Sequence, residues 1–252
     1  MPLTGLFSQR NVRTRSWVMS EQGAGMTHNL QHEYLKAMGV QRWVVRGKVG
    51  ETVADSVPEQ VGEGAGSVVP DWSSLETQVS TCKKCQLHES RTQTVFGAGN
   101  RHADWLIIGE APGAEEDRQG EPFVGRAGKL LTEMLFACGL QRADVYIANI
   151  LKCRPPANRD PAPDEVACCH AYLQQQIALM QPQLILVVGR IAAHSLLQTD
   201  CQLGRLRGKV HHYGDTGIPV IVTYHPAYLL RSPLEKRKVW SDLQFAKTLK
   251  KQ

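Results

Sequence analysis

Residues 105–113 read Trp-Leu-Ile-Ile-Gly-Glu-Ala-Pro-Gly, which places four large apolar side chains directly before a glycine, an acid and a turn. A short apolar run bounded by turn residues is typical of a strand buried on both faces of a sheet. Three later runs have the same character: Val145–Ala148, Leu184–Val188 and Val220–Thr223. Helical patterns lie between the runs, at Gly128–Cys138, Pro163–Gln181 and Arg190–Leu197. This alternation predicts an α/β fold, a three-layer α/β/α sandwich with a central, mostly parallel sheet of four strands.

The folded domain is predicted to span residues 72–252, preceded by an N-terminal extension over residues 1–71. Apolar residues at helical spacing over 30–46 predict one short amphipathic helix in the extension. Residues 47–71 are rich in Gly, Val, Ser and acids, and we interpret them as an acidic flexible linker.

The composition excludes several classes of protein. The chain has 252 residues, a net charge of +5 and 42% hydrophobic residues, as an ordinary soluble globular protein does. It contains no apolar run near the roughly 18 residues that span a bilayer, and no secretory signal, so we expect a cytoplasmic protein. The odd count of seven cysteines favours thiols or metal ligands over disulfides. The basic segment 226–252 suits a polyanionic partner, although a solvated helix end explains it equally well.

Side chains of catalytic type directly follow three of the predicted strands. Glu110 follows the first strand, Asn149 the second and His225 the fourth. Because ligands bind beyond the C-terminal ends of parallel strands, we expect these side chains to meet at one edge of the sheet. The Gly-rich loop after the first strand carries one aromatic residue, Phe123, which is either a core plug or a platform for a flat base. Each residue alone also fits a turn or a cap, but three on one edge favour a ligand site.

Four of the cysteines form two pairs. Cys82 and Cys85 make a CxxC motif, and Cys153 and Cys169 lie 16 residues apart. A CxxC pair is compatible with zinc, an iron–sulfur cluster or redox chemistry. There is no second CxxC pair and no zinc-finger histidine pair, which favours an iron–sulfur cluster and leaves zinc and unrelated thiols open. Cys168 points about 100° away from Cys169 on the predicted helix, so only one of them serves readily as a ligand.

Seven motifs occur in a specific order along the chain. They are CKKC (82–85), VFGAGN (95–100), GEAPG (109–113), GEPFVGRAGKLL (120–131), NILKCRPP (149–156), the ExxxC of Glu165 and Cys169, and HPAYLL (225–230). Together they resemble the family 4 uracil-DNA glycosylases, the iron–sulfur branch of the uracil-DNA glycosylase superfamily. The resemblance spans about residues 72–250 and does not cover the extension. It implies a glycosylase-like fold, excision of uracil flipped out of DNA, and a [4Fe–4S] cluster.

The resemblance also implies roles for individual residues. The cluster ligands would be Cys82, Cys85, Cys153 and Cys169, with the spacing from Glu165 selecting Cys169 over Cys168. Glu110 and His225 would be catalytic, and Gly109, Phe123 and Asn149 would hold the base. Contacts to DNA would come from Tyr228, Leu229, Leu230 and Arg231, unless the two leucines are core residues of a helix. The expected partner is uracil-containing DNA, single- or double-stranded, bound by a monomer.

Three alternatives stay open. The first is a non-catalytic DNA-binding or replication accessory module on the same fold. Such a module does not need the catalytic-type residues that this chain has, and their presence argues against it. The second is the branch of the superfamily that traps DNA covalently through a histidine in an inserted basic loop. Residues 154–163 have neither a histidine nor an insertion, which argues against that branch. The third is a relative that acts on another deaminated base.

Overall fold

The computed structural model describes residues 71–249. The predicted helix over 30–46 and the acidic linker lie outside these residues, apart from Asp71 at the end of the linker. The carboxylate of Asp71 accepts a hydrogen bond from the Ser74 amide at 2.8 Å and caps helix α2 (Trp72–Ser80). The described part of the chain thus begins with a capped helix.

A six-stranded sheet forms the middle of the molecule. Its strands are β1 (Ala98–Gly99), β2 (Trp105–Gly109), β3 (Val145–Asn149), β4 (Leu184–Val188), β5 (Val210–Tyr213) and β6 (Ile218–Thr223). The order across the sheet is β1-β3-β2-β4-β6-β5. The four central strands are parallel and are the four predicted from sequence. The two edge strands are antiparallel additions that the sequence did not indicate.

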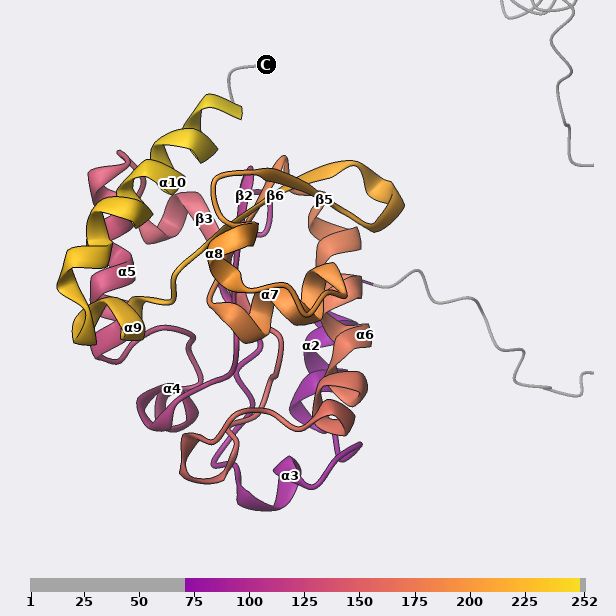
Figure 1. Cartoon of the computed structure of the whole chain (residues 1–252). Helices are drawn as coiled ribbons and strands as arrows, with labels where there is room; N and C mark the ends of the chain where they lie inside the picture. The colour runs from indigo at the N-terminus through magenta and orange to yellow at the C-terminus, as the bar shows by residue number, and fades with distance from the viewer. Residues whose placement is uncertain (1–70, 250–252) are drawn as a thin grey trace, which may run out of the picture. The chain divides into compact units, whose positions relative to one another are not determined.

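Helices cover both faces of this sheet (Figure 1). Their bounds are α2 (Trp72–Ser80), α3 (Leu87–Ser90), α4 (Ala114–Gln119), α5 (Arg126–Ala137), α6 (Pro163–Met180), α7 (Arg190–Leu197), α8 (Leu203–Leu206), α9 (Pro226–Arg231) and α10 (Lys236–Leu249). The predicted three-layer α/β/α architecture is therefore confirmed. Among residues 71–249, no helix is both long enough and apolar enough to cross a membrane.

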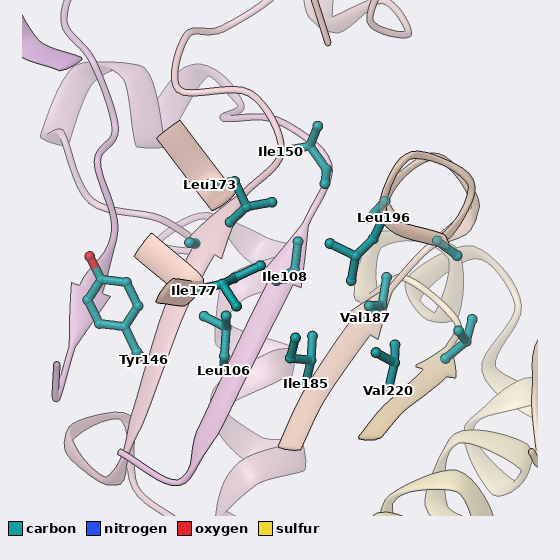
Figure 2. Close-up of a cluster of buried hydrophobic side chains, with 14 of the residues drawn as sticks. Leu106, Ile108, Tyr146, Ile150, Leu173, Ile177, Ile185, Val187, Leu196 and Val220 are labelled. Carbon is teal, nitrogen blue, oxygen red and sulfur yellow. The ribbon is translucent and has the colours of Figure 1, made fainter. Parts of the chain in front are cut away.

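Alternate residues of each strand face opposite helical layers, which gives two hydrophobic clusters. One cluster joins the sheet to α6 and α7 through Leu106, Ile108, Ile185, Val187, Leu173, Ile177 and Leu196 (Figure 2). The other joins the sheet to α5 and α10 through Trp105, Ile107, Leu186, Leu131, Leu135, Val239 and Leu243. Both faces of the central strands are therefore buried, which explains their continuous apolar sequences.

The strand order determines which helix covers which face. Helix α5 connects β2 to β3 in one direction across the sheet, and α6 connects β3 back to β4 in the other. Because parallel crossovers are right-handed, opposite directions place the two helices on opposite faces. Where the order reverses, the loops diverge and leave a crevice at the C-terminal edge of the strands. The residues that follow β2, β3 and β6 surround this crevice.

The long segment between β2 and α5 is more ordered than expected. Its acidic middle forms the short helix α4, with Gly113 as the N-terminal cap and Gly120 in the left-handed conformation at the C-terminal end. The Gly113 amide donates to the Glu116 carboxylate at 3.1 Å, so a G-x-x-E pattern begins the helix. A six-residue helix carries too weak a periodicity to stand out from a Gly-rich loop.

Candidate active site

A pocket of about 490 Å³ opens at the C-terminal edge of the sheet. Its walls include Glu110 after β2, Phe123 before α5, Asn149 at the end of β3 and His225 after β6. The structure thus brings together the four residues singled out from sequence, which are separated by up to 115 positions in the chain. The pocket is large enough for one flat heterocycle together with part of a sugar.

The floor of the pocket depends on a close approach at Gly109. Gly109 and Asn149 are register partners across β2 and β3. A Cβ atom built on Gly109 would collide with Asn149 Oδ1 and would lie 2.5 Å from Cζ of Phe123. Only glycine therefore allows the amide of Asn149 and the ring of Phe123 to close over this position.

Phe123 is held in an uncommon backbone conformation. Its φ is 56°, in the left-handed region that non-glycine residues seldom adopt. The guanidinium of Arg142 donates to the carbonyls of Phe123 and Pro122, at 3.2 and 2.7 Å. A Cβ atom at Gly128 would overlap the Phe123 carbonyl. Such strain persists only where the surroundings fix it, and it points to a functional position for the ring.

The side chain of Asn149 is buried and incompletely bonded. The residue is 2% exposed, and its Oδ1 atom has no hydrogen-bond partner among the described residues. A buried acceptor without a donor destabilises the protein by about 1–3 kcal/mol. Because Asn149 lines the pocket, an N–H group of a ligand bound there is a candidate partner for this acceptor.

His225 is a neutral hydrogen-bond donor at this edge. Its Nδ1 accepts from the Ala227 amide at 3.1 Å, so the ring proton resides on Nε2. Burial, with a further contribution from nearby Arg231, lowers the pKa of His225 to about 4, and Glu116 opposes this effect. The ring lies 5.6 Å from that of Phe123, centroid to centroid.

Glu110 has a carboxyl group that ionises near neutrality. Burial, with a further contribution from the charge of Asp160, raises its pKa to about 7 against the opposing effect of Arg190. Arg190 also forms an ion pair with Asp160, at 3.1 Å. A carboxyl with a shifted pKa inside a cleft marks a candidate catalytic group.

Glu116 organises the loop around the pocket and was missed by the sequence reasoning. Its carboxylate accepts from the amides of Gly113, Val124 and Gly125 at 2.9–3.1 Å. It therefore ties the start of α4 to the segment that carries Phe123. The available signal was its place three residues after Gly113, where an acid caps a helix.

The cysteine segments gather on the other side of the Asn149 strand end. Cys85, Cys153 and Cys169 pack with Leu87 and Leu151 in one apolar cluster. The thiol of Cys82 interacts electrostatically with those of Cys85 and Cys153. Arg91 donates to Cys153 Sγ at 3.0 Å.

Cys168 and Cys169 lie in different environments on α6. Cys169 is buried, whereas Cys168 is partly exposed and contacts the Lys84 carbonyl at 3.3 Å. Glu165, in the first turn of α6, accepts two hydrogen bonds from the guanidinium of Arg159, at 2.6 and 2.9 Å. These bonds fix the start of the helix that carries both cysteines. Arg159 also lines the pocket, so the same ion pair links the cysteine helix to the candidate site.

Helix α9 presents only some of the residues expected to contact DNA. Tyr228 is 37% exposed and Leu230 is 40% exposed, and Arg231 is exposed beside the pocket. Leu229 is 1% exposed and belongs to the core cluster with α5 and α10. Its expected contact with DNA does not agree with this burial, because the helix turns that side chain toward the sheet.

Sequence comparisons identify the family of this chain. The sequence model of the Uracil DNA glycosylase superfamily matches residues 96–244, and the chain belongs to that superfamily. The Type-4 uracil-DNA glycosylase of Archaeoglobus fulgidus is 46% identical over 66% of this chain and 87% of that protein. Those of Pyrobaculum aerophilum and Thermotoga maritima are each 42% identical over 69% of this chain, and over 91% and 92% of their own lengths. The predicted resemblance to the family 4 branch is thereby confirmed.

The raised pKa of Glu110 predicts a stability that depends on pH. The folded state holds the Glu110 proton up to about pH 7, whereas the unfolded chain releases it near the ordinary value of 4.5. The contribution of Glu110 to the free energy of unfolding is therefore fully present below about pH 4.5 and is lost as the pH rises to about 7. Glu110→Gln, which cannot ionise, should be more stable than the wild type at pH 8 by up to about 3 kcal/mol.

Urea unfolding of both proteins at about pH 5 and about pH 8 measures this difference. Glu133→Gln, which changes an exposed side chain of α5, is the reference for removing one carboxylate. A stability difference that is the same at both pH values would show that Glu110 ionises normally.

Proposed function

We propose that this chain is a DNA repair glycosylase that flips uracil out of DNA and hydrolyses its N-glycosidic bond to leave an abasic site. The relatives named Type-4 uracil-DNA glycosylase support this reaction. The observation that carries the proposal at the residue level is the unpaired Asn149 Oδ1 in the pocket. This oxygen lacks a hydrogen-bond donor, and one N–H group of a planar ligand would supply it.

The Asn149 amide matches the edge of uracil. Its oxygen would accept from N3–H and its nitrogen would donate to O4. Cytosine presents a donor at position 4 and an acceptor at N3, so the same amide would face two mismatched groups. A buried mismatch of this kind disfavours the wrong base by about 1–3 kcal/mol for each unpaired group. The ring of Phe123, which closes the pocket beside the amide, would stack on the base.

His225 and Glu110 would stabilise the charges that develop as the bond breaks. The leaving uracil gains negative charge while the sugar becomes cationic. Nε2–H of the neutral His225 would donate to O2 of the departing base, and the ionised Glu110 would stabilise the sugar or orient the attacking water. Fixed donors in a site that excludes water are the largest single source of such catalysis.

The exposed side of α9 would contact the duplex. Leu230 would enter the stack vacated by the flipped base, and Tyr228 and Arg231 would contact the adjoining nucleotides. Lys236 and Arg237 are exposed at the start of α10 and would neutralise phosphates. Leu229 is excluded from this role by its burial.

We propose that the four cysteines hold an iron–sulfur cluster rather than zinc. Among residues 71–249, no three His, Cys, Asp or Glu side chains converge closely enough to hold a metal ion. Zinc needs its sulfurs about 2.3 Å from one point, whereas each thiolate of a [4Fe–4S] cluster binds a different iron. Cys82, Cys85, Cys153 and Cys169, which lie near one another without converging on one point, would hold the cluster. The bound cluster would supply a cross-link between three chain segments.

Uracil excision should require both Asn149 and His225. On a uracil-containing oligonucleotide, His225→Ala should lower the single-turnover rate about 100- to 1000-fold, because a donor to the leaving anion is lost. Asn149→Ala should lower it about tenfold to a hundredfold. Strand scission by alkali at abasic sites measures the rate.

His212→Ala is the matched control for the histidine, because His212 is exposed on β5. Wild-type rates in both pocket variants would contradict the mechanism. DNA binding by the wild type without excision would favour the non-catalytic accessory module.

Leu230→Ala should affect duplex DNA more than single strands. The methyl group of Ala is too small to fill the space that the flipped base leaves in the duplex, so kcat/KM for uracil in a duplex should fall about tenfold. A single strand has no such space, so its kcat/KM should change little. Comparing the two substrates with one variant provides an internal control. An equal loss on both substrates would assign Leu230 to general DNA binding instead.

Cys169→Ser and Cys168→Ser should differ sharply in metal content. Cys169 is buried among the other cysteines, so its loss should remove most of the iron and sulfide bound per chain. Cys168→Ser makes the same chemical change one residue away and should retain both. Iron and sulfide analysis with the visible absorption spectrum measures the outcome. Zinc in the wild-type protein, or equal iron loss in both variants, would contradict the assigned ligands.

A further inference from the structure

Lys152 is a buried cation next to the cysteine cluster. The residue is 1% exposed and directly precedes Cys153. Its ammonium donates to the Asn149 carbonyl at 2.9 Å and to Gln176 Oε1 at 2.6 Å. Both acceptors are neutral, so they satisfy hydrogen bonds without balancing the charge.

A buried ammonium needs a counter-charge. Among residues 71–249, Lys152 forms no ion pair with a carboxylate. Burial disfavours the charge on Lys152, and the groups that act electrostatically in its favour are the sulfurs of Cys169 and Cys153. The Lys152 backbone amide also donates to the Cys169 sulfur. An isolated buried charge is strongly unfavourable, which points to the cysteine site as its partner.

We infer that Lys152 is the buried counter-cation of the cysteine-bound cluster and positions Asn149 for uracil. The inference rests on the proposed iron–sulfur cluster. Four thiolate charges outweigh the charge of the cluster core, so the centre is anionic and attracts the ammonium. The ammonium in turn holds the carbonyl of the residue whose side chain reads the base.

The contacts around Lys152 extend this connection into the fold. Gln176 on α6, which accepts from Lys152, donates its own amide to the Phe96 carbonyl at 2.9 Å. The Lys152 carbonyl accepts from the Val95 amide at 2.8 Å. Lys152 therefore lies between the cysteine segments on one side and the C-terminal end of β3 on the other. It acts through Asn149 and is a positioning residue.

Two measurements on Lys152→Met test the inference in the full-length, cluster-loaded protein. Met has a similar length and no charge. Cluster potentials respond to nearby charge, so the equilibrium constant for one-electron reduction should fall at least tenfold, a shift of about 59 mV to more negative potential. Inhibition by free uracil should weaken about tenfold, because Asn149 is no longer fixed. Lys83→Met is the matched control, since Lys83 is exposed between two ligands and water screens its charge.

The inference requires both changes in Lys152→Met and neither change at that size in Lys83→Met. An unchanged potential in a variant with full iron content would show that Lys152 is not the counter-charge. A shifted potential with unchanged inhibition by uracil would overturn the link to Asn149. If Lys152→Met does not fold, Lys152→Leu, which also lacks the charge and the donor to the Asn149 carbonyl, serves for both measurements. Wild-type protein without iron and sulfide would remove the proposed cofactor and the inference together, whereas the outcomes above leave excision and the cluster intact.

Discussion

The candidate site depends on the absence of a side chain at Gly109. The parallel register places Gly109 opposite Asn149, and the Asn149 amide and the Phe123 ring occupy the space that a Cβ atom would need. Any larger residue would push the amide and the ring apart. The Asn149 amide, the Phe123 ring and the end of β2 therefore pack as one unit. This unit rests on a sheet that is buried on both faces.

Several features of the site are individually unfavourable. Phe123 has a positive φ, Asn149 has an unpaired buried oxygen, and Glu110 loses ionisation to burial. The positive φ of Phe123 is held by the bonds from Arg142 to the carbonyls of Phe123 and Pro122. The two hydrophobic clusters supply the stability that tolerates these features. Localised strain at a site carried by a well-packed scaffold is typical of enzymes.

Much of the fold was predictable because its signals are local. The central strands are apolar on both faces, so the four runs that begin at Trp105, Val145, Leu184 and Val220 stand out in the sequence. The edge strands β1 and β5 have no such signal, since one has two residues and the other is half-exposed. The short helix α4 was likewise hidden in a Gly-rich loop. Its existence depends on Glu116 reaching back to Gly113 and forward to Gly125.

The sequence by itself determined the class of fold, the edge at which Glu110, Asn149 and His225 meet, and the superfamily. These follow from chain order, periodicity and motif spacing, which are properties of neighbouring residues. Only the tertiary structure decided that Leu229 faces the core while Leu230 faces solvent, that His225 is neutral with its proton on Nε2, and that Lys152 has no carboxylate partner among residues 71–249. Burial, tautomer and charge balance depend on atoms brought together from distant parts of the chain, and no local pattern encodes them.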